Sequence, residues 1–322
     1  MLTAMTGQPG TTHCLQIRAD VVVKRFRSYA RGEPRREWQA LGMLARYAPG
    51  LAPAPVHAAL DAEPPVVVMS RLPGDAIGTR PLTAGQVAAV AASIRRLHRA
   101  APPGVLEAAE PMPFAPVTAA ARIRAMAAAA SVPEDPDARL ALHHASSWLE
   151  RGQAERAAAS GGTAVFGHGD ANLANYLQDG GTVRLVDFED SGRSDRAWEL
   201  AIFTEHLSVH GCGQVSADLA LGHFDTGTAE RARIGEYRRL LATFWLLMLL
   251  PGGPSHRRNP PGTLQHPGIP PTGPAGLRPT FFTRKLPKRQ IGLRSPRSAS
   301  CEGGPTLAQL TPPSAAALLA GT

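Results

Sequence analysis

Residues 166–192 read FGHGDANLANYLQDGGTVRLVDFEDSG, and this stretch decides the fold. Two short apolar segments, around 175–177 and 183–186, lie on either side of the turn residues 179–181. This order of apolar segment, turn and apolar segment predicts a β-hairpin. Helical spacing on both sides of the stretch places the hairpin inside an otherwise helical domain.

The polar residues of the same stretch form a set that carries chemistry. His168, Asp170 and Asn175 are followed twelve residues later by Asp187, at loop positions beside the short strands. Phosphoryl transfer needs one acid that orients the attacking hydroxyl and a second acid and an amide that hold magnesium. The alternative is that these residues cap loops and that His168 is a packed core histidine, which requires a chance match at fixed spacing.

The first 75 residues predict a small mixed lobe. The sequence CLQIRADVVVKRF (14–26) predicts two antiparallel strands joined by a tight turn, and VVVMS (66–70) predicts a third. Between them, residues 34–48 show helical spacing behind a proline. Lys24, on the second strand, offers a cation for phosphate oxygens, and Glu37, on the helix, can pair with it.

The next 175 or so residues are predicted to be mainly helical. Thr83 and Gln86 form a T-x-x-Q capping box before a helix that reaches the residues near 100. Further helices are expected in parts of 116–130, 137–157, 195–210 and 230–250. The apolar run 240–250 is about half the length needed to span a bilayer. It is expected to be a core helix that packs behind the hairpin, and no membrane partner is expected.

The last 72 residues differ in composition from the rest. Residues 251–322 contain nine Lys or Arg and one acid, so they carry the whole formal net charge of +8. They also contain 24 prolines and glycines, which predicts disorder for most of the tail, 265–322. The basic residues are scattered among prolines without helical periodicity, so we expect a solvated tail and no nucleic-acid partner.

The motifs VVVKRF, REWQALGMLA, PPVVVMSRLPG, FGHGDANLANYL, VDFEDSG and SDRAWELA together resemble one family, the aminoglycoside phosphotransferase and choline kinase-like group. These are small-molecule kinases, and the resemblance covers residues 15–264. It implies an α+β, two-lobed, protein-kinase-like fold. The β-rich N-lobe (1–74) would bind the nucleotide, and the larger, mostly helical C-lobe (75–264) would contain the catalytic β-hairpin, followed by the disordered tail.

The resemblance also implies roles for single residues. Asp170 would be the catalytic base, and Asn175 and Asp187 would bind magnesium. Lys24 would contact the α- and β-phosphates, with Glu37 as its ion-pair partner.

Other residues of the resemblance concern the adenine end of the nucleotide. Ser70 to Leu72 would form the hinge whose backbone faces adenine, and Met69 would line the pocket. His168 would brace the catalytic loop, and Glu199, where many relatives have Asp, is expected to play a supporting role.

The predicted function is an ATP- and Mg²⁺-dependent phosphotransferase that moves the γ-phosphate to a hydroxyl of a small molecule, such as an aminoglycoside, an amino alcohol or a sugar. One alternative is a nucleotide-binding pseudoenzyme or non-functional remnant with an altered C-terminus. Another is a nucleic-acid-binding protein, which deletion of residues 265–322 would separate from a kinase.

Other sequence features favour a cytoplasmic location and argue against a zinc centre. The beginning of the sequence lacks the layout of a signal peptide, and three widely spaced cysteines predict no disulfide framework, which favours the cytoplasm. A metal cluster could be drawn from Glu205, His206, His210 and Cys212. However, no glutamate lies between the two histidines as in a zincin motif, and no fourth ligand has a suitable spacing, so surface or core histidines are expected.

Overall fold

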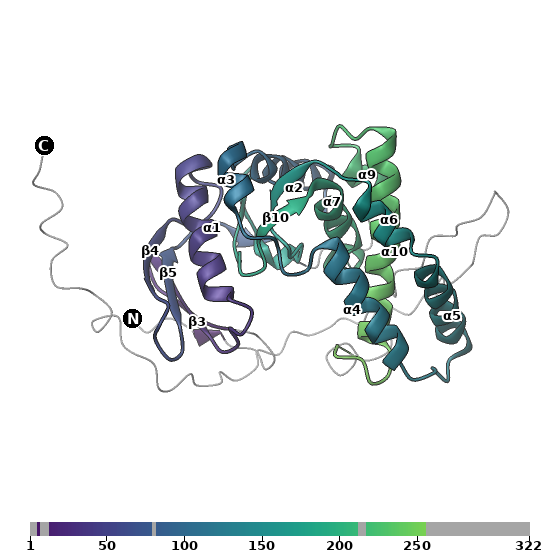
Figure 1. Cartoon of the computed structure of the whole chain (residues 1–322). Helices are drawn as coiled ribbons and strands as arrows, with labels where there is room; N and C mark the ends of the chain where they lie inside the picture. Colours follow the sequence, from purple (N-terminus) through teal and green to yellow (C-terminus); the bar gives the residue numbers. More distant parts are fainter. Residues whose placement is uncertain (1–4, 7–12, 79–81, 212–216, 256–322) are drawn as a thin grey trace, which may run out of the picture.

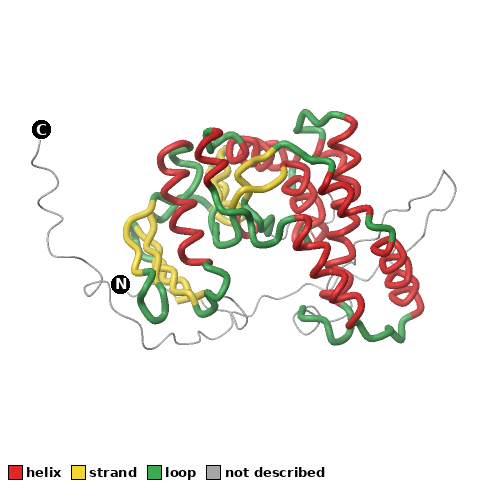
Figure 2. Tube along the Cα trace, in the orientation of Figure 1, coloured by secondary structure: helices red, strands yellow, loops and turns green. Residues whose placement is uncertain are grey.

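The computed structural model describes residues 5–6, 13–78, 82–211 and 217–255. A β-rich N-terminal part lies beside a larger part built mostly of helices (Figures 1 and 2). The fold is therefore α+β, as predicted. The expectation of disorder for 265–322 lies outside the described residues.

The N-terminal part is an antiparallel sheet with one helix against it. In chain order its elements are β1 (Met5–Thr6), β2 (His13–Ile17), β3 (Val21–Phe26), α1 (Glu33–Tyr47), β4 (Pro55–Ala59) and β5 (Val66–Ser70). The strands lie in the order β1-β2-β3-β5-β4. The predicted strands at 14–26 and 66–70 and the helix at 34–48 are confirmed, whereas β4 was not predicted because PVHAA lacks an alternating pattern.

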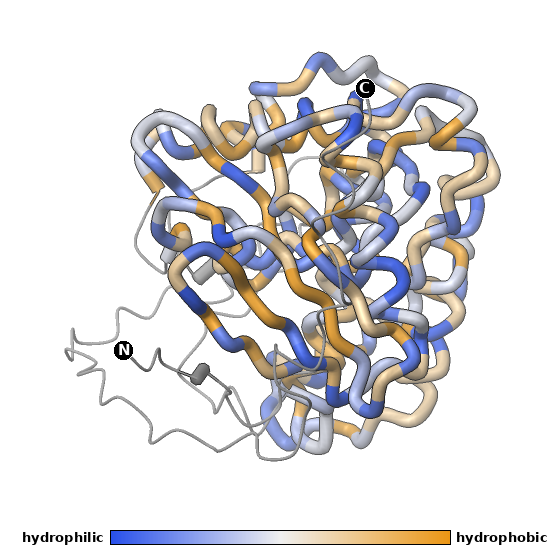
Figure 3. The backbone as a smooth tube through the Cα atoms, turned by 90° about the vertical axis from the view of Figure 1, so that its left-hand side faces the viewer, coloured by the Kyte–Doolittle hydropathy of each residue, from blue (hydrophilic) through white to orange (hydrophobic). Residues whose placement is uncertain are grey.

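Strand β3 is central in this sheet and holds Lys24 in place. The turn after β2 is closed by the Arg18 N–H, which donates to the Val21 carbonyl at 2.9 Å. Lys24 then pairs with Leu15 of β2 on one side and Val67 of β5 on the other. Figure 3 shows the hydrophobic stretches of these strands in orange and the hydrophilic segments around them in blue.

Helix α1 lies against this sheet and carries Glu37. Pro34 stands in its first turn, where a missing N–H costs no hydrogen bond. Its buried face contains Leu41 and Leu44, which belong to the main hydrophobic core together with Met69 of β5. Because Glu37 is also on this buried face, its carboxylate points into the protein instead of into water.

The larger part contains most of the helices and two small sheets, β10-β7 and β6-β8-β9. Its elements are β6 (Asp75–Ala76), α2 (Ala84–His98), α3 (Pro103–Ala108), α4 (Pro116–Ala129), α5 (Pro136–Glu150), α6 (Gln153–Ala159), β7 (Ala164–Gly167), the 3-10 turn η1 (Leu173–Asn175), β8 (Tyr176–Asp179), β9 (Thr182–Leu185), β10 (Gly192–Asp195), α7 (Arg196–Glu205), α8 (Leu207–Gly211), α9 (Ala217–Leu221) and α10 (Thr228–Leu249).

The predicted hairpin is present as β8 and β9, with Asp179 opposite Thr182 across the turn. Strand β6 extends it, and β7 pairs with β10 nearby. Neither β6, β7 nor β10 was predicted, because strands of two to four residues are too short for a periodic pattern. Helix α2 supports the hairpin from one side, where the Ser93 hydroxyl donates to the Val183 carbonyl at 2.6 Å.

The predicted helices are confirmed with two refinements. The capping box of α2 is present, with the Gln86 N–H donating to the Thr83 hydroxyl. The helix expected at 137–157 is divided into α5 and α6 at Gly152. The apolar run 240–250 ends α10, but α10 packs chiefly against α7, which corrects the expected location behind the hairpin. In the part of the chain that the structure describes, no helix is both long and apolar enough to cross a bilayer.

Cys14, on β2, is buried. Cys212 and Cys301 lie outside the described residues, so the absence of a disulfide framework stays a prediction.

Candidate functional site

The loop between β7 and η1 holds the first group of predicted site residues. His168 is buried, and its ring Nε2 lies 2.9 Å from the Val186 carbonyl. Its Nδ1 accepts the backbone N–H of Asp170 at 3.3 Å, so the ring proton belongs on Nε2, which donates to Val186. The histidine thus ties the start of this loop to the strand that leads to Asp187.

Asp170 projects from this loop with about a third of its side chain exposed. Its Oδ1 accepts the Asn172 N–H at 3.0 Å, and its Oδ2 accepts the Asn175 side-chain amide at 2.9 Å. Two donors therefore fix the carboxylate while part of it still meets solvent. This is the arrangement that a group needs if it must accept a proton from a bound hydroxyl.

Asp187 lies beside this loop just after β9. The Val186 N–H donates to the Asn175 carbonyl at 3.0 Å, which joins the two segments. Asp187 has φ = 71°, and it is the one non-glycine residue with positive φ among the described residues. Such a conformation is strained for an L-residue and persists where the surroundings impose it, which is typical of functional sites.

Lys24 brings the two parts of the protein together at Asp187. Its Nζ lies 2.6 Å from Glu37, 2.5 Å from Asp187 and 2.9 Å from Glu189. Burial alone would lower the pKa of Lys24, but the three carboxylates raise it above its ordinary value, so the ammonium stays charged. Burial also raises the pKa of Glu37, against the opposing effect of Lys24.

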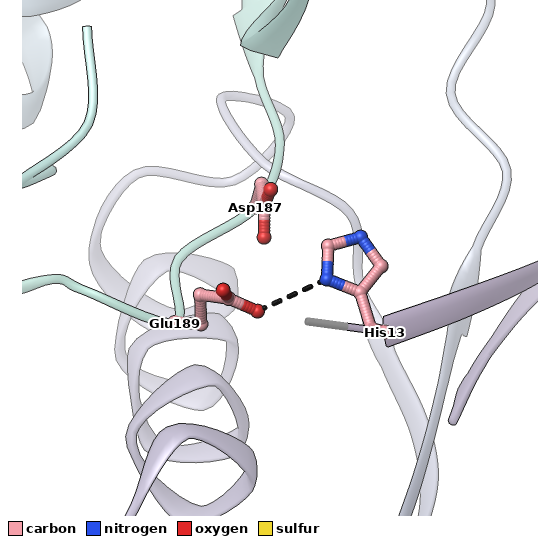
Figure 4. Close-up of side chains that lie close together, drawn as sticks. All are labelled: His13, Asp187 and Glu189. Atoms are coloured by element: carbon pink, nitrogen blue, oxygen red, sulfur yellow. Dashed lines mark hydrogen bonds and ion pairs between the residues drawn. The ribbon is translucent and has the colours of Figure 1, made fainter. Parts of the chain in front are cut away.

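His13 lies at the same place, at the start of β2. Its Nδ1 is 3.2 Å from Glu189, and Figure 4 shows its ring beside Glu189 and Asp187. Ligand atoms of His13, Asp187 and Glu189 all lie within 4.8 Å of one another. The carboxylate oxygens of Asp187 and Glu189, beside the imidazole of His13, are donors of the kind that suit a divalent cation.

Glu199, in the first turn of α7, supports the loop that carries His168 and Asp170. It is buried, and its carboxylate accepts the backbone N–H of His168 at 2.9 Å and the Ser194 hydroxyl at 3.0 Å. Burial raises its pKa above the ordinary value, against these hydrogen bonds. A Cβ on Gly167 would lie 2.3 Å from this carboxylate, so a glycine there lets the acid approach the loop.

Two arginines of the N-terminal part hold the segment after Asp187, and sequence reasoning missed both. Arg31 pairs with Asp190 at 2.8 Å, and Arg36 donates to the Ser191 carbonyl at 3.1 Å. Burial raises the pKa of Asp190, with Arg31 acting in the opposite direction. Asp190 is part of the VDFEDSG motif, which was the available signal for it, whereas nothing in the sequence distinguishes Arg31 or Arg36 from the other arginines.

The residues predicted for the adenine end lie where β5 leaves the sheet. Met69 is buried in the main core, and Ser70 and Leu72 are partly exposed. The Ser70 N–H donates to the Ala54 carbonyl, and the Arg71 N–H donates to the Asp20 carbonyl, both at 2.8 Å. Residues 70–72 thus lie at the end of β5, where the chain leaves the N-terminal sheet and passes to β6 of the larger part.

A sequence profile of the phosphotransferase enzyme family matches residues 11–237, which contain every site residue described above. The chain belongs to this family. Members of this family are small-molecule phosphotransferases, and the protein belongs to this activity class. No curated protein matches the chain.

Solved structures show the fold of this phosphotransferase. A choline/ethanolamine kinase family protein from Mesorhizobium loti has 18% identity and a TM-score of 0.52, over 76% of this chain and 80% of that one. The GDP and kanamycin complex of APH(2")-IIia has 15% identity and a TM-score of 0.57, over 76% and 85%. The Streptomyces rimosus aminoglycoside phosphotransferase APH(3'')-Id with ADP and streptomycin has 16% identity and a TM-score of 0.52, over 76% and 94%. At such identities the likeness shows a shared kinase-like fold.

Proposed function

We propose that this phosphotransferase moves the γ-phosphate of ATP to a hydroxyl of a small molecule, with magnesium as its metal ion. One observation carries the proposal. The Lys24–Glu37 pair meets Asp187 at 2.5 Å, and Asp187 follows a strand joined by a backbone hydrogen bond to the segment that holds Asp170. A cation for phosphates and a partly exposed carboxylate are thus fixed in one site.

The nucleotide would bind with its phosphates at Lys24 and its adenine at the end of β5. Of the N–H groups in this hinge, those of Ser70 and Arg71 already donate to backbone carbonyls, and Pro73 has none. The N–H of Leu72 is the remaining donor for a ring nitrogen of adenine. Met69, buried just before the hinge, would form the inner wall of the pocket.

Asp187 and Asn175 would hold the magnesium ion. Asp187 is about a quarter exposed, so one of its oxygens is accessible, and Asn175 offers an amide oxygen while its NH₂ donates to Asp170. The bound ion would neutralise charge on the nucleotide phosphates. Carboxylate oxygens gather around Lys24, and oxygen donors of this kind favour the binding of the ion.

Asp170 would act as the base. Its partly exposed carboxylate orients the acceptor hydroxyl in line with the γ-phosphate. It takes the hydroxyl proton as the new oxygen–phosphorus bond forms and the bond from the γ-phosphorus to the bridging oxygen of the leaving ADP breaks. Positioning and electrostatic stabilisation supply most of the rate in such reactions. His168 and Glu199 hold the loop and touch neither reactant.

We propose that the acceptor is a hydroxylated amine or a sugar. Two of the solved structures with this fold contain kanamycin or streptomycin, and a third belongs to a choline/ethanolamine kinase family. All of these small molecules carry hydroxyl groups. We also propose the division into an N-lobe (1–74) and a C-lobe (75–264), because the nucleotide would lie between β5 and Asp187.

The test is a thermal-shift titration of the protein with ATP, with and without magnesium. A ligand at a hundred times its dissociation constant adds about 2.7 kcal/mol of stability. We expect a magnesium-dependent rise that Asp187→Ala lacks and Asp170→Ala keeps. A folded protein without any rise would contradict the proposal.

Turnover is then measured with a panel of aminoglycosides, amino alcohols and sugars. Asp170→Ala should abolish transfer, since loss of a positioned base costs about 100-fold or more. Magnesium-dependent nucleotide binding without transfer to any acceptor would instead support the pseudoenzyme alternative.

The place of Lys24 can be tested chemically. Lys24 is the only lysine among the first 284 residues. An acyl-phosphate derivative of ATP, which acylates an amine near the phosphates, should label Lys24, and excess MgATP should prevent this labelling. Labelling confined to lysines beyond residue 284 would contradict the proposed phosphate site.

A further inference from the structure

His206, which the sequence analysis set aside as a surface or core histidine, lies beside Asp170. It is the C-cap residue that follows α7, and its Nε2 lies 3.5 Å from Oδ1 of Asp170. About 15% of its side chain is exposed. The histidine therefore faces the proposed base from the C-terminal end of α7, the helix whose first turn carries Glu199.

The neighbours of His206 fix the position of its ring proton. The backbone N–H of Ser208 donates to Nδ1 at 3.2 Å, and the Ser208 hydroxyl lies 2.8 Å from the same nitrogen. Because a backbone N–H can only donate, Nδ1 is an acceptor in the neutral ring. The proton of neutral His206 is therefore on Nε2, the nitrogen that faces the carboxylate of Asp170.

The same serine connects His206 to the loop that carries Asp170. The Ser208 hydroxyl oxygen accepts the backbone N–H of Leu173 at 2.9 Å. The other face of the histidine is held by α10, where Trp245 packs edge-on at a ring-centroid distance of 5.2 Å. Thus the position of the imidazole is set by three elements at once, and a ring fixed in this way can hold a flexible neighbour in one rotamer.

We propose that His206 is a positioning residue for the catalytic carboxylate, acting through the polar contact of its Nε2–H with Oδ1 of Asp170 at 3.5 Å. This inference rests on the proposed function, in which Asp170 is the base. Asn175 holds Oδ2 in the structure, but its amide is also needed at the metal. A second donor at Oδ1 keeps the carboxylate oriented when the acceptor hydroxyl approaches Oδ2.

Two variants separate the N–H from the shape of the ring. His206→Phe retains an aromatic ring against Trp245 but has no donor, whereas His206→Gln retains a side-chain N–H. Turnover is measured with an acceptor from the panel above or, in its absence, as ATP hydrolysis with water as acceptor. We expect kcat to fall about 10- to 100-fold in His206→Phe, the cost of a displaced catalytic group, with KM for ATP unchanged.

His206→Gln should recover most of the lost kcat, and both variants should keep the thermal shift with MgATP. A His206→Phe variant with wild-type kcat would overturn the proposal. So would a His206→Gln variant as impaired as His206→Phe, because the N–H would then have no special role.

A spectroscopic measurement decides the matter without turnover. Long-range ¹H–¹⁵N spectra of histidine-labelled protein report which ring nitrogen carries the proton, and the signals of His206 are identified by their loss in His206→Gln. We expect the Nε2–H form in the wild type and a displaced Nε2 signal in Asp170→Asn. An Nδ1–H form, or an Nε2 signal that Asp170→Asn leaves in place, would refute the contact even if the protein transferred no phosphate.

Discussion

At the scale of single residues, the site depends on one buried cation. Lys24 is 2% exposed, and three carboxylates from α1 and from the segment after β9 lie within 3 Å of its Nζ. A charge in such surroundings is stable only when its partners are present, because desolvation of each ion costs several kcal/mol. The lysine thus has two roles, since it would bind phosphate and it also keeps the acids folded into the site.

The double role of Lys24 gives a testable prediction. Lys24→Met should remove the MgATP-dependent thermal shift and also destabilise the protein by about 3–5 kcal/mol, because the buried carboxylate of Glu37 would lose its cation. Urea unfolding without nucleotide measures the second effect.

The matched control is the double variant Lys24→Met/Glu37→Met, which removes one uncompensated acid together with the lysine. We expect it to be more stable than Lys24→Met alone. If the double variant were less stable by the sum of two independent losses, the ion pair would not be the source of the effect.

At the scale of elements, the loop after β7 is held by close backbone packing. Gly169 has φ = 82°, and a Cβ at this position would lie 2.3 Å from the Asp190 carbonyl oxygen. The loop that carries Asp170 and the segment that follows Asp187 can approach each other because this residue has no side chain. The glycine of the His-Gly-Asp sequence is therefore a packing requirement of the site.

Gly169→Ala should accordingly lower both stability and turnover. The left-handed conformation alone costs about 1–3 kcal/mol for an L-residue, and the contact with Asp190 must also be relieved. Gly181→Ala, in the hairpin turn, is the matched control, since a Cβ there meets nothing within 4 Å. Thermal unfolding and kcat should change in the first variant and remain close to wild type in the second. Equal effects in both would show that backbone contact with Asp190 is unimportant.

At the scale of the whole molecule, helix α2 of the helical part reaches the site through its last residue, His98. His98 lines a small pocket together with His168, Asp170 and Glu199. Its ring is partly exposed as a whole, but its Nε2 is buried and has no partner among the described residues. Burial, with Arg196 as a second cause, lowers the pKa of His98 from 6.5 to about 3. Protonation would place a charge on this buried nitrogen.

This shift predicts how folding stability depends on pH. Between the folded pKa of about 3 and the unfolded value of 6.5, the unfolded chain binds more protons than the folded one. Stability contributed by neutral His98 is therefore complete above the unfolded pKa and is lost as pH falls through this window, by up to about 1.4 kcal/mol per pH unit.

Urea unfolding of the wild type and of His98→Gln at several pH values, from about 7.5 to about 5, measures this loss. We expect the wild type to lose stability more steeply than the variant as the pH falls. Parallel pH profiles would mean that His98 takes up a proton equally well in the folded protein.

The sequence by itself determined the elements with a clear local pattern. The strands at 14–26 and 66–70, helix α1, the capped helix α2 and the β8–β9 hairpin were all predicted, because each depends on residues close together in the chain. The spacing of Asp170, Asn175 and Asp187 also predicted the class of chemistry, since all three flank one short hairpin. The family of the chain follows from these same motifs.

Tertiary structure decided which distant side chains meet. Strand β4 and the pair β7–β10 exist because their neighbours supply hydrogen bonds, although their own sequences show no strand pattern. Lys24 and Glu189, and likewise His206 and Asp170, come from different elements, and local periodicity carries no information about such contacts. Their positions follow from the packing of α1 on the sheet and of α7 on α10, so only the folded chain shows the acids around Lys24 and the histidine beside Asp170.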